Sequence, residues 1–149
     1  MGDLMRPISA MAADTVEAVA RLEAEVLKLP QVDIETHHAF HAGMYARTIK
    51  VPAGVLLTGA LIKIPTVLVI SGDAVVYTSE GPVEIVGYHV MLGSAGRKQA
   101  FVARADTWLT MIFPTTVTTV PEAERQFTND YDRLFSRRDG ATNEIVGEE

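Results

Sequence analysis

Residues 66–92, TVLVISGDAVVYTSEGPVEIVGYHVML, decide the fold class. Short β-branched and apolar runs are separated by Gly72-Asp73 and by the segment 79–82, which are typical of tight turns. The same pattern continues on both sides and predicts eight strands, at 44–51, 55–63, 66–71, 74–78, 83–86, 89–92, 99–104 and 107–113. Short strands at regular spacing predict a mainly β fold, an antiparallel sandwich or barrel.

One amphipathic helix is predicted on each side of this β region. Over residues 14–29 apolar side chains recur at helical spacing, Asp14 and Glu17 form a capping-box pattern, and Pro30 ends the helix. Pro121 is well placed as the first residue of the second helix, predicted over 121–138. We therefore expect a single domain over 1–149, with an N-terminal arm and helix (1–30), a β-barrel (31–115), the C-terminal helix and a polar tail (139–149) whose last residues would ordinarily be disordered.

Composition excludes several classes of function. The chain of 149 residues has no cysteine, which excludes disulfides, thiolate metal sites and a cysteine nucleophile. Its net charge of -6 and its scattered basic residues argue against nucleic-acid binding. Acids near the N-terminus and the lack of a run of ~20 apolar residues lead us to expect neither a secretion signal nor a membrane span.

The strand-and-turn pattern is specific enough to suggest a family. Over residues 40–115 the chain resembles the cupins, and more narrowly the short cupin-like proteins of tailed bacteriophages. The pieces that carry the resemblance are Gly43-x-Tyr45-x-Arg47, Pro52-Ala53-Gly54, Gly72-Asp73, Ala95-Gly96 with Lys98, and Asp106-Thr107-Trp108. This resemblance implies a jelly-roll barrel of about eight short antiparallel strands.

The resemblance also implies where a metal would bind. A metal-binding cupin has two histidines and a carboxylate in its first motif and a third histidine in its second motif. Here the first window, residues 60–67, reads ALIKIPTV, and Gln99 occupies the place of the third histidine. The resemblance therefore implies a cupin that has lost its metal-ligand positions, and we expect no cofactor.

A histidine cluster is the other candidate for chemistry. Three of the four histidines lie in HHAFH, residues 37–41. On an extended strand His37 and His41 share one face and His38 takes the other, so at most two imidazoles converge. Structural histidines are the favoured interpretation. Two alternatives stay open, a pH-responsive interface and a metal site formed by His37, His38, His41 and His89.

Other polar residues are candidates for binding at the barrel mouth or at an interface. Tyr45 and Arg47 share a strand face and belong to the family pattern. The full candidate set is Tyr45, Arg47, Lys63, Gln99 and Arg104.

The favoured hypothesis is a non-enzymatic structural or interaction protein that forms homo-oligomers. The phage resemblance makes it a virion-associated protein that decorates or cements a capsid, located in the virion or the host cytoplasm. Supporting features are the lost ligands and an apolar interior predicted from Leu56, Leu61, Ile64, Leu68 and Ile70. One alternative is a metal-dependent cupin enzyme, of isomerase or oxygenase type, that uses the histidine cluster. The other is a metal-free cupin that binds a small molecule.

Overall fold

The computed structural model describes residues 5–8 and 10–147. In this part of the chain, strands predominate over helices. The elements in chain order are β1 (Met5–Ile8), α1 (Ala13–Val26), β2 (Thr36–His41), β3 (Met44–Val51), β4 (Leu56–Thr58), β5 (Thr66–Thr78), β6 (Gly81–Gly93), β7 (Ala100–Ala103), β8 (Thr107–Pro114), α2 (Val120–Phe127), the 3-10 turns η1 (Tyr131–Arg133) and η2 (Phe135–Arg137), and β9 (Asn143–Val146).

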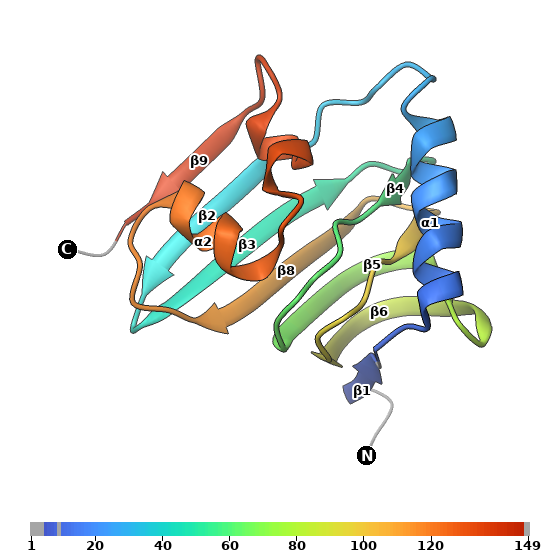
Figure 1. The fold of residues 1–149 in the computed structure, drawn as a ribbon, viewed down its shortest axis with the longest axis horizontal. Coiled ribbons are helices and arrows are strands. Elements are labelled where there is room, and N and C mark those ends of the chain that lie inside the picture. Colours follow the sequence, from blue (N-terminus) through green and yellow to red (C-terminus); the bar gives the residue numbers. More distant parts are fainter. Residues whose placement is uncertain (1–4, 9, 148–149) are drawn as a thin grey trace.

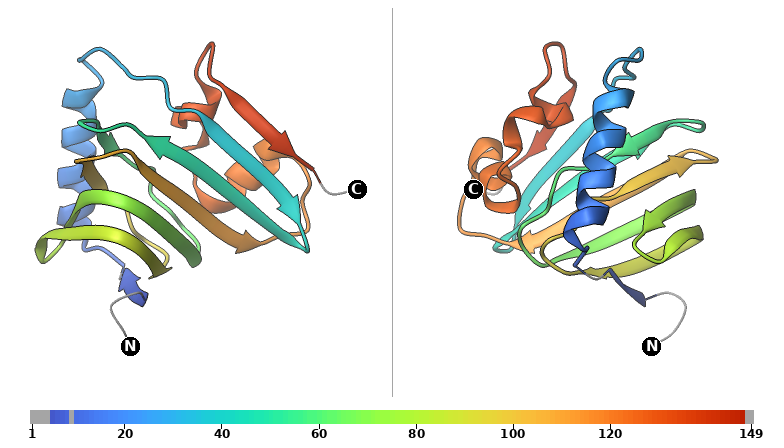
Figure 2. Two further views of the ribbon diagram at one scale, coloured as in Figure 1. Left: turned by 180° about the vertical axis from the view of Figure 1, so that it is seen from behind. Right: turned by 45° about the vertical axis from the view of Figure 1, so that its right-hand side comes forward.

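All the described strands belong to one curled sheet (Figure 1). Its order is β1-β6-β5-β8-β3-β2-β9, and β7 joins β4 to β5. The pairs are antiparallel except at the two ends, where β1 pairs with β6 and β9 pairs with β2 in parallel. Both helices lie on the concave side, α1 across β4, β5 and β6, and α2 over β2, β3 and β8 (Figures 1 and 2). The predicted fold class, a mainly β jelly roll with a helix near each end, is confirmed.

The turn predicted at Gly72-Asp73 and the break predicted between strands 83–86 and 89–92 are both wrong. Gly72 and Gly87 do not end strands but lie opposite each other within β5 and β6, each of which is one continuous strand. Gly72 has a φ of +153°, and a Cβ at this position would lie 2.5 Å from Thr107 Oγ1. Glycine is needed there because two neighbouring strands approach closely. The strand predicted over 55–63 is also shorter, since β4 covers only Leu56–Thr58.

The two helices and the C-terminal tail each differ from the prediction. Ala12 occupies the N-cap of α1, and Asp14 in the first turn accepts a hydrogen bond from the Thr15 N–H instead of capping the helix. The helix predicted over 121–138 ends at Phe127, because the backbone of Thr128 is extended, with φ of -151° and ψ of 149°. The Phe127 carbonyl accepts a hydrogen bond from the Lys63 N–H. The polar tail contains β9, because β2 offers it a free edge with open backbone groups.

The core has two parts on the concave side. The first lies beneath α1 and includes Leu57, Ile70, Ile85 and Phe101. The second lies beneath α2 and is aromatic, with Phe40, Tyr45, Phe113 and Phe127. Of the predicted interior residues, Ile70 is buried, and Leu56, Ile64 and Leu68 are half-buried. The prediction for Leu61 is wrong, because its side chain is 36% exposed. Among the described helices, none is long and apolar enough to cross a membrane.

Candidate functional site

A cavity of about 1130 Å³ opens on the concave side of the sheet. The sheet forms its back wall, and α1 with the following residues 27–34 and the turns η1 and η2 forms its rim (Figure 1). Most of the lining is apolar and includes Ile34, Ile49, Leu57, Ile70, Val76, Ile85, Met91, Phe101, Leu109 and Met111. The interior of this barrel is thus a cavity lined mainly by apolar side chains.

Lys98 and Glu23 form a buried ion pair in the cavity wall. Lys98 Nζ lies 3.0 Å from Glu23 Oε2 and donates a second hydrogen bond to the Gly59 carbonyl at 2.8 Å. Thr58 Oγ1 donates to the same Glu23 oxygen at 3.3 Å. Glu23 therefore ties α1 to the barrel.

Arg97 is the second cation of the wall, and it is only 2% exposed. It donates hydrogen bonds to the Ser94 carbonyl at 2.8 Å and to Thr66 Oγ1. Its guanidinium lies against Gly93, where a Cβ would come within 2.6 Å of Arg97 Cζ. Burial lowers the pKa of Arg97 to about 10. No ion pair joins Arg97 to an acid of the described residues. Its charge is therefore compensated only by the dipoles of the Ser94 carbonyl and the Thr66 hydroxyl.

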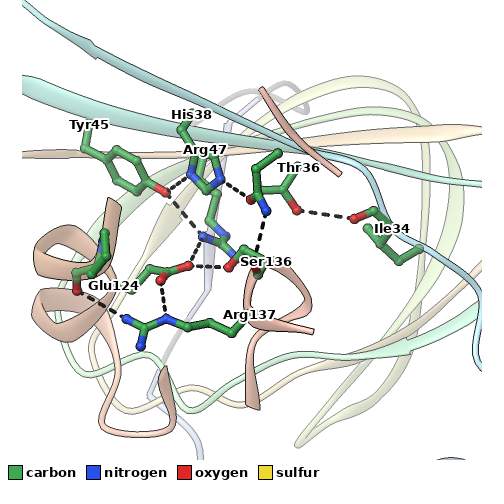
Figure 3. A network of polar contacts seen from close by, with 10 residues as sticks. Ile34, Thr36, His38, Tyr45, Arg47, Glu124, Ser136 and Arg137 are labelled. Carbon is green, nitrogen blue, oxygen red and sulfur yellow. Dashed lines mark hydrogen bonds and ion pairs between the residues drawn. The ribbon is translucent and has the colours of Figure 1, made fainter. Parts of the chain in front are cut away.

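A second polar cluster links the sheet to the C-terminal segment (Figure 3). His38 of β2 lies between the Tyr45 hydroxyl, 2.6 Å from Nδ1, and Asn143 Oδ1, 2.7 Å from Nε2. Tyr45 Oη also accepts a hydrogen bond from Arg47 Nη1. Because an amide oxygen only accepts, His38 Nε2–H donates to Asn143 Oδ1. Burial, with the charge of Arg47 acting in the same direction, lowers the pKa of His38, and burial raises the pKa of Tyr45.

Glu124 of α2 is the acid of this cluster and is almost fully buried. It accepts hydrogen bonds from Arg47 Nη1 at 2.9 Å, from Arg137 Nε at 2.7 Å and from the Ser136 hydroxyl. Burial alone would raise the pKa of Glu124, but the bonds from Ser136 and Arg137 and the charge of Arg47 outweigh it, and the pKa is lowered. Every group in this cluster has a partner, so we assign it to holding the C-terminal segment on the sheet.

The structure brings only part of the predicted binding set to the cavity. Arg47 and Gln99 line it. Tyr45 is buried in the polar cluster. Lys63 is exposed and donates to Asn129 Oδ1, and Arg104 is exposed and pairs with Asp73 and Glu84 on the outer hairpin. Three residues of the wall that were not predicted as a set are Glu23, Arg97 and Lys98. The sequence signal for Arg97 and Lys98 was the short cationic turn at 96–98, and Glu23 had none.

The structure does not bring together the four histidines of the alternative metal site. His38 is engaged by Tyr45 and Asn143, and His89 lies on β6, where its Nε2 is 2.8 Å from the Val86 carbonyl oxygen. Within residues 5–8 and 10–147, the one group with metal-ligand spacing is Glu35, His37 and Glu144, on the outer side of β2 and β9. It holds His37 between two exposed carboxylates, 3.5 Å from each, away from the cavity.

Comparison with known proteins gives a likeness of fold. No protein-family model matches the sequence, and no curated protein matches it either. A cupin superfamily protein from Desulfitobacterium hafniense DCB-2 superposes with a TM-score of 0.46 and 13% identity, over 62% of this chain and 86% of that chain. A cupin-2 domain protein from Shewanella frigidimarina gives a TM-score of 0.41 and 12% identity, over 66% and 98%.

A larger enzyme is also similar in fold. A mutant salicylate 1,2-dioxygenase from Pseudoaminobacter salicylatoxidans gives a TM-score of 0.49 and 12% identity, over 85% of this chain and 40% of that chain. At such identities and TM-scores the likeness concerns the path of the chain alone.

Proposed function

We propose that this protein binds a small, largely apolar molecule in its barrel, without a metal ion. The observation that carries the proposal is the cavity of about 1130 Å³ with its apolar lining. Small-molecule sites are typically concave spaces of roughly 300–1,000 Å³, lined by apolar side chains with a few polar groups that orient the ligand. This cavity has that composition and is large enough for a ligand of drug-like size.

Arg97 supplies the polar group. It lines the cavity, and its charge has no acidic partner among the described residues. A hydrogen-bond acceptor on the ligand, such as a carboxylate or a carbonyl, gains a charge-assisted bond there. The proposed ligand is therefore an apolar ring or chain that carries one acceptor group.

Thermal unfolding in the presence of a metabolite panel tests this function. A ligand at 100 times its Kd stabilises the folded chain by about 2.7 kcal/mol, which raises the Tm by several degrees. Val76→Trp places bulk in the cavity, and Tyr77→Trp adds an indole on the outer face of the same strand. Ligand shifts should be lost in the first variant and kept in the second. A flat panel, together with no displacement of an apolar fluorescent dye, would contradict the proposal.

The enzyme alternative has its own test. Elemental analysis of the purified protein detects zinc, iron or nickel bound in stoichiometric amount. Such a metal would replace the metal-free proposal by a metal-dependent one.

The virion-associated structural role stays a prediction from the phage resemblance. What favours an interaction role is the apolar outer face of the sheet, where Val86, Tyr88 and Trp108 are exposed. Co-purification with assembled particles in fixed copy number tests the virion location, and its absence from particles would contradict it.

A further inference from the structure

The convex face of the sheet is apolar, and none of the described residues forms a layer over it. Seen from behind, the strands lie in front and both helices lie behind them (Figure 2, left). Tyr88 is 56% exposed, Trp108 44%, Val67 39% and Leu92 38%. We use the name convex patch for six outward side chains of this face, which are Val67, Val69, Tyr88, Leu92, Trp108 and Ile112. Contiguous exposed apolar surface of this kind marks an interaction site.

Strand register arranges this face in rows that cross β3, β8, β5 and β6. The first row is Ala46, Ile112, Val67 and Leu92, and all four are apolar. The second is Thr48, Thr110, Val69 and Val90. The third is Lys50, Trp108, Ser71 and Tyr88. The first and third rows contain small side chains beside large ones.

The few polar groups on this face can be covered at little cost. Thr48 Oγ1 and Thr110 Oγ1 hydrogen-bond to each other at 2.7 Å, so each hydroxyl of the middle row already has one partner. Lys50 lies over the Trp108 ring and pairs with Asp106 at one end of the face. An apolar centre with charges at the rim is the usual anatomy of a protein–protein interface.

We infer that a second copy of this chain covers the convex patch, sheet against sheet. A two-fold axis that runs along the strands between β5 and β8 places β8 opposite β5 of the partner and β3 opposite β6 of the partner. Trp108 then faces Ser71 of the partner subunit, and Leu92 faces Ala46 of the partner subunit. Large side chains meet small ones in both cases, as close packing requires.

The size of the face agrees with a weak dimer. The four strands of these rows, about 4.8 Å apart, and the three rows about 6.8 Å apart cover roughly 400 Å² of each subunit. Two such faces give about 800 Å² in total, the size of weak, transient interfaces. The centre carries no net charge, which gives a strongly charged partner nothing to bind.

Oligomeric state in solution is the first test. The wild-type chain should sediment as a dimer. Val67→Lys and Trp108→Lys each bury a charge without a partner in this interface, and each should raise the dimer Kd roughly 100-fold or more. Leu61→Lys is the control, since Leu61 is similarly exposed but lies outside the patch. Because all three side chains are exposed, each variant should keep the wild-type fold, and circular dichroism measures this.

Cysteine pairs test the geometry, because the chain has no cysteine of its own. Ala46 and Leu92 are three strands apart, about 14 Å, which is too far for a disulfide within one chain. Oxidation of Ala46→Cys/Leu92→Cys should therefore give covalent dimers. The control Ala46→Cys/Tyr88→Cys is out of row by about 14 Å and should not cross-link. A monomeric wild type, a dimer insensitive to both lysine variants, or cross-linking by the control pair alone would overturn the proposal and leave the face to a different partner.

Discussion

Lys98 Nζ lies 3.0 Å from Glu23 Oε2, and their side chains are only 5% and 16% exposed. This pair joins α1 to the barrel wall beside the cavity, across 75 residues of sequence. Since α1 forms part of the cavity rim, the same contact fixes one side of the proposed binding site.

Glu23→Gln should destabilise the fold. The substitution leaves the Lys98 ammonium buried without a countercharge, and removing one partner of a buried pair costs about 3–5 kcal/mol, less here because Glu23 keeps some contact with water. Urea unfolding measures the change. Glu25→Gln on the same helix is the control, since its pair with Lys28 is exposed and worth less than about 1 kcal/mol. Equal losses in the two variants would contradict the assigned role.

Gly72→Ala should destabilise the fold more than Gly87→Ala. Both residues have a positive φ, which an alanine adopts at a cost of roughly 1–2 kcal/mol. Only at Gly72 would the new Cβ also collide with a neighbour, 2.7 Å from Thr107 Cα, whereas at Gly87 nothing lies within 4 Å. A thermal denaturation series on the two variants checks the order of their Tm values. A reversed order would show that β5 and β8 do not approach closely at Gly72.

His38 should make stability fall as the pH drops below about 6.5. Its pKa in the folded chain is lowered, chiefly by burial, so in this range the unfolded chain binds a proton that the folded chain does not. Unfolding free energies between pH 7 and pH 5 measure the slope. His38→Gln should flatten it, and His41→Gln, at an exposed position, should keep it. An unchanged slope in the His38 variant would assign the effect to other groups.

Glu124→Gln should loosen the C-terminal segment. Without the carboxylate, Arg47 and Arg137 face each other uncompensated in a buried site, and the loss should be about 3–5 kcal/mol. Trypsin should then cleave sooner at Arg137 and Arg138 than in the wild type, with mass spectrometry identifying the fragments. Asp132→Asn is the matched control, because Asp132 is exposed and lies 3.8 Å from Arg137. Unchanged cleavage in Glu124→Gln would show that other contacts hold the segment.

Local patterns in the sequence determined the fold class. Short β-branched and apolar runs between turn residues predicted a mainly β chain, and the helical spacing over 14–29 predicted α1, because both signals depend on neighbouring residues alone. The same local signals misjudged Gly72 and Gly87, since a glycine that ends a strand and one that lets two strands approach look alike in sequence.

Only the tertiary structure decided which polar residues meet. Glu23 reaches Lys98 and His38 reaches Asn143, 105 residues later, through the curl of the sheet, and no local pattern announces such contacts. The histidines that looked like one cluster were separated because neighbours on a strand point to opposite faces, and His89 lies on another strand. The sequence by itself determined a β-barrel without cysteine chemistry. Long-range packing placed an apolar cavity inside it and an apolar sheet outside, because both surfaces exist only once distant strands have paired.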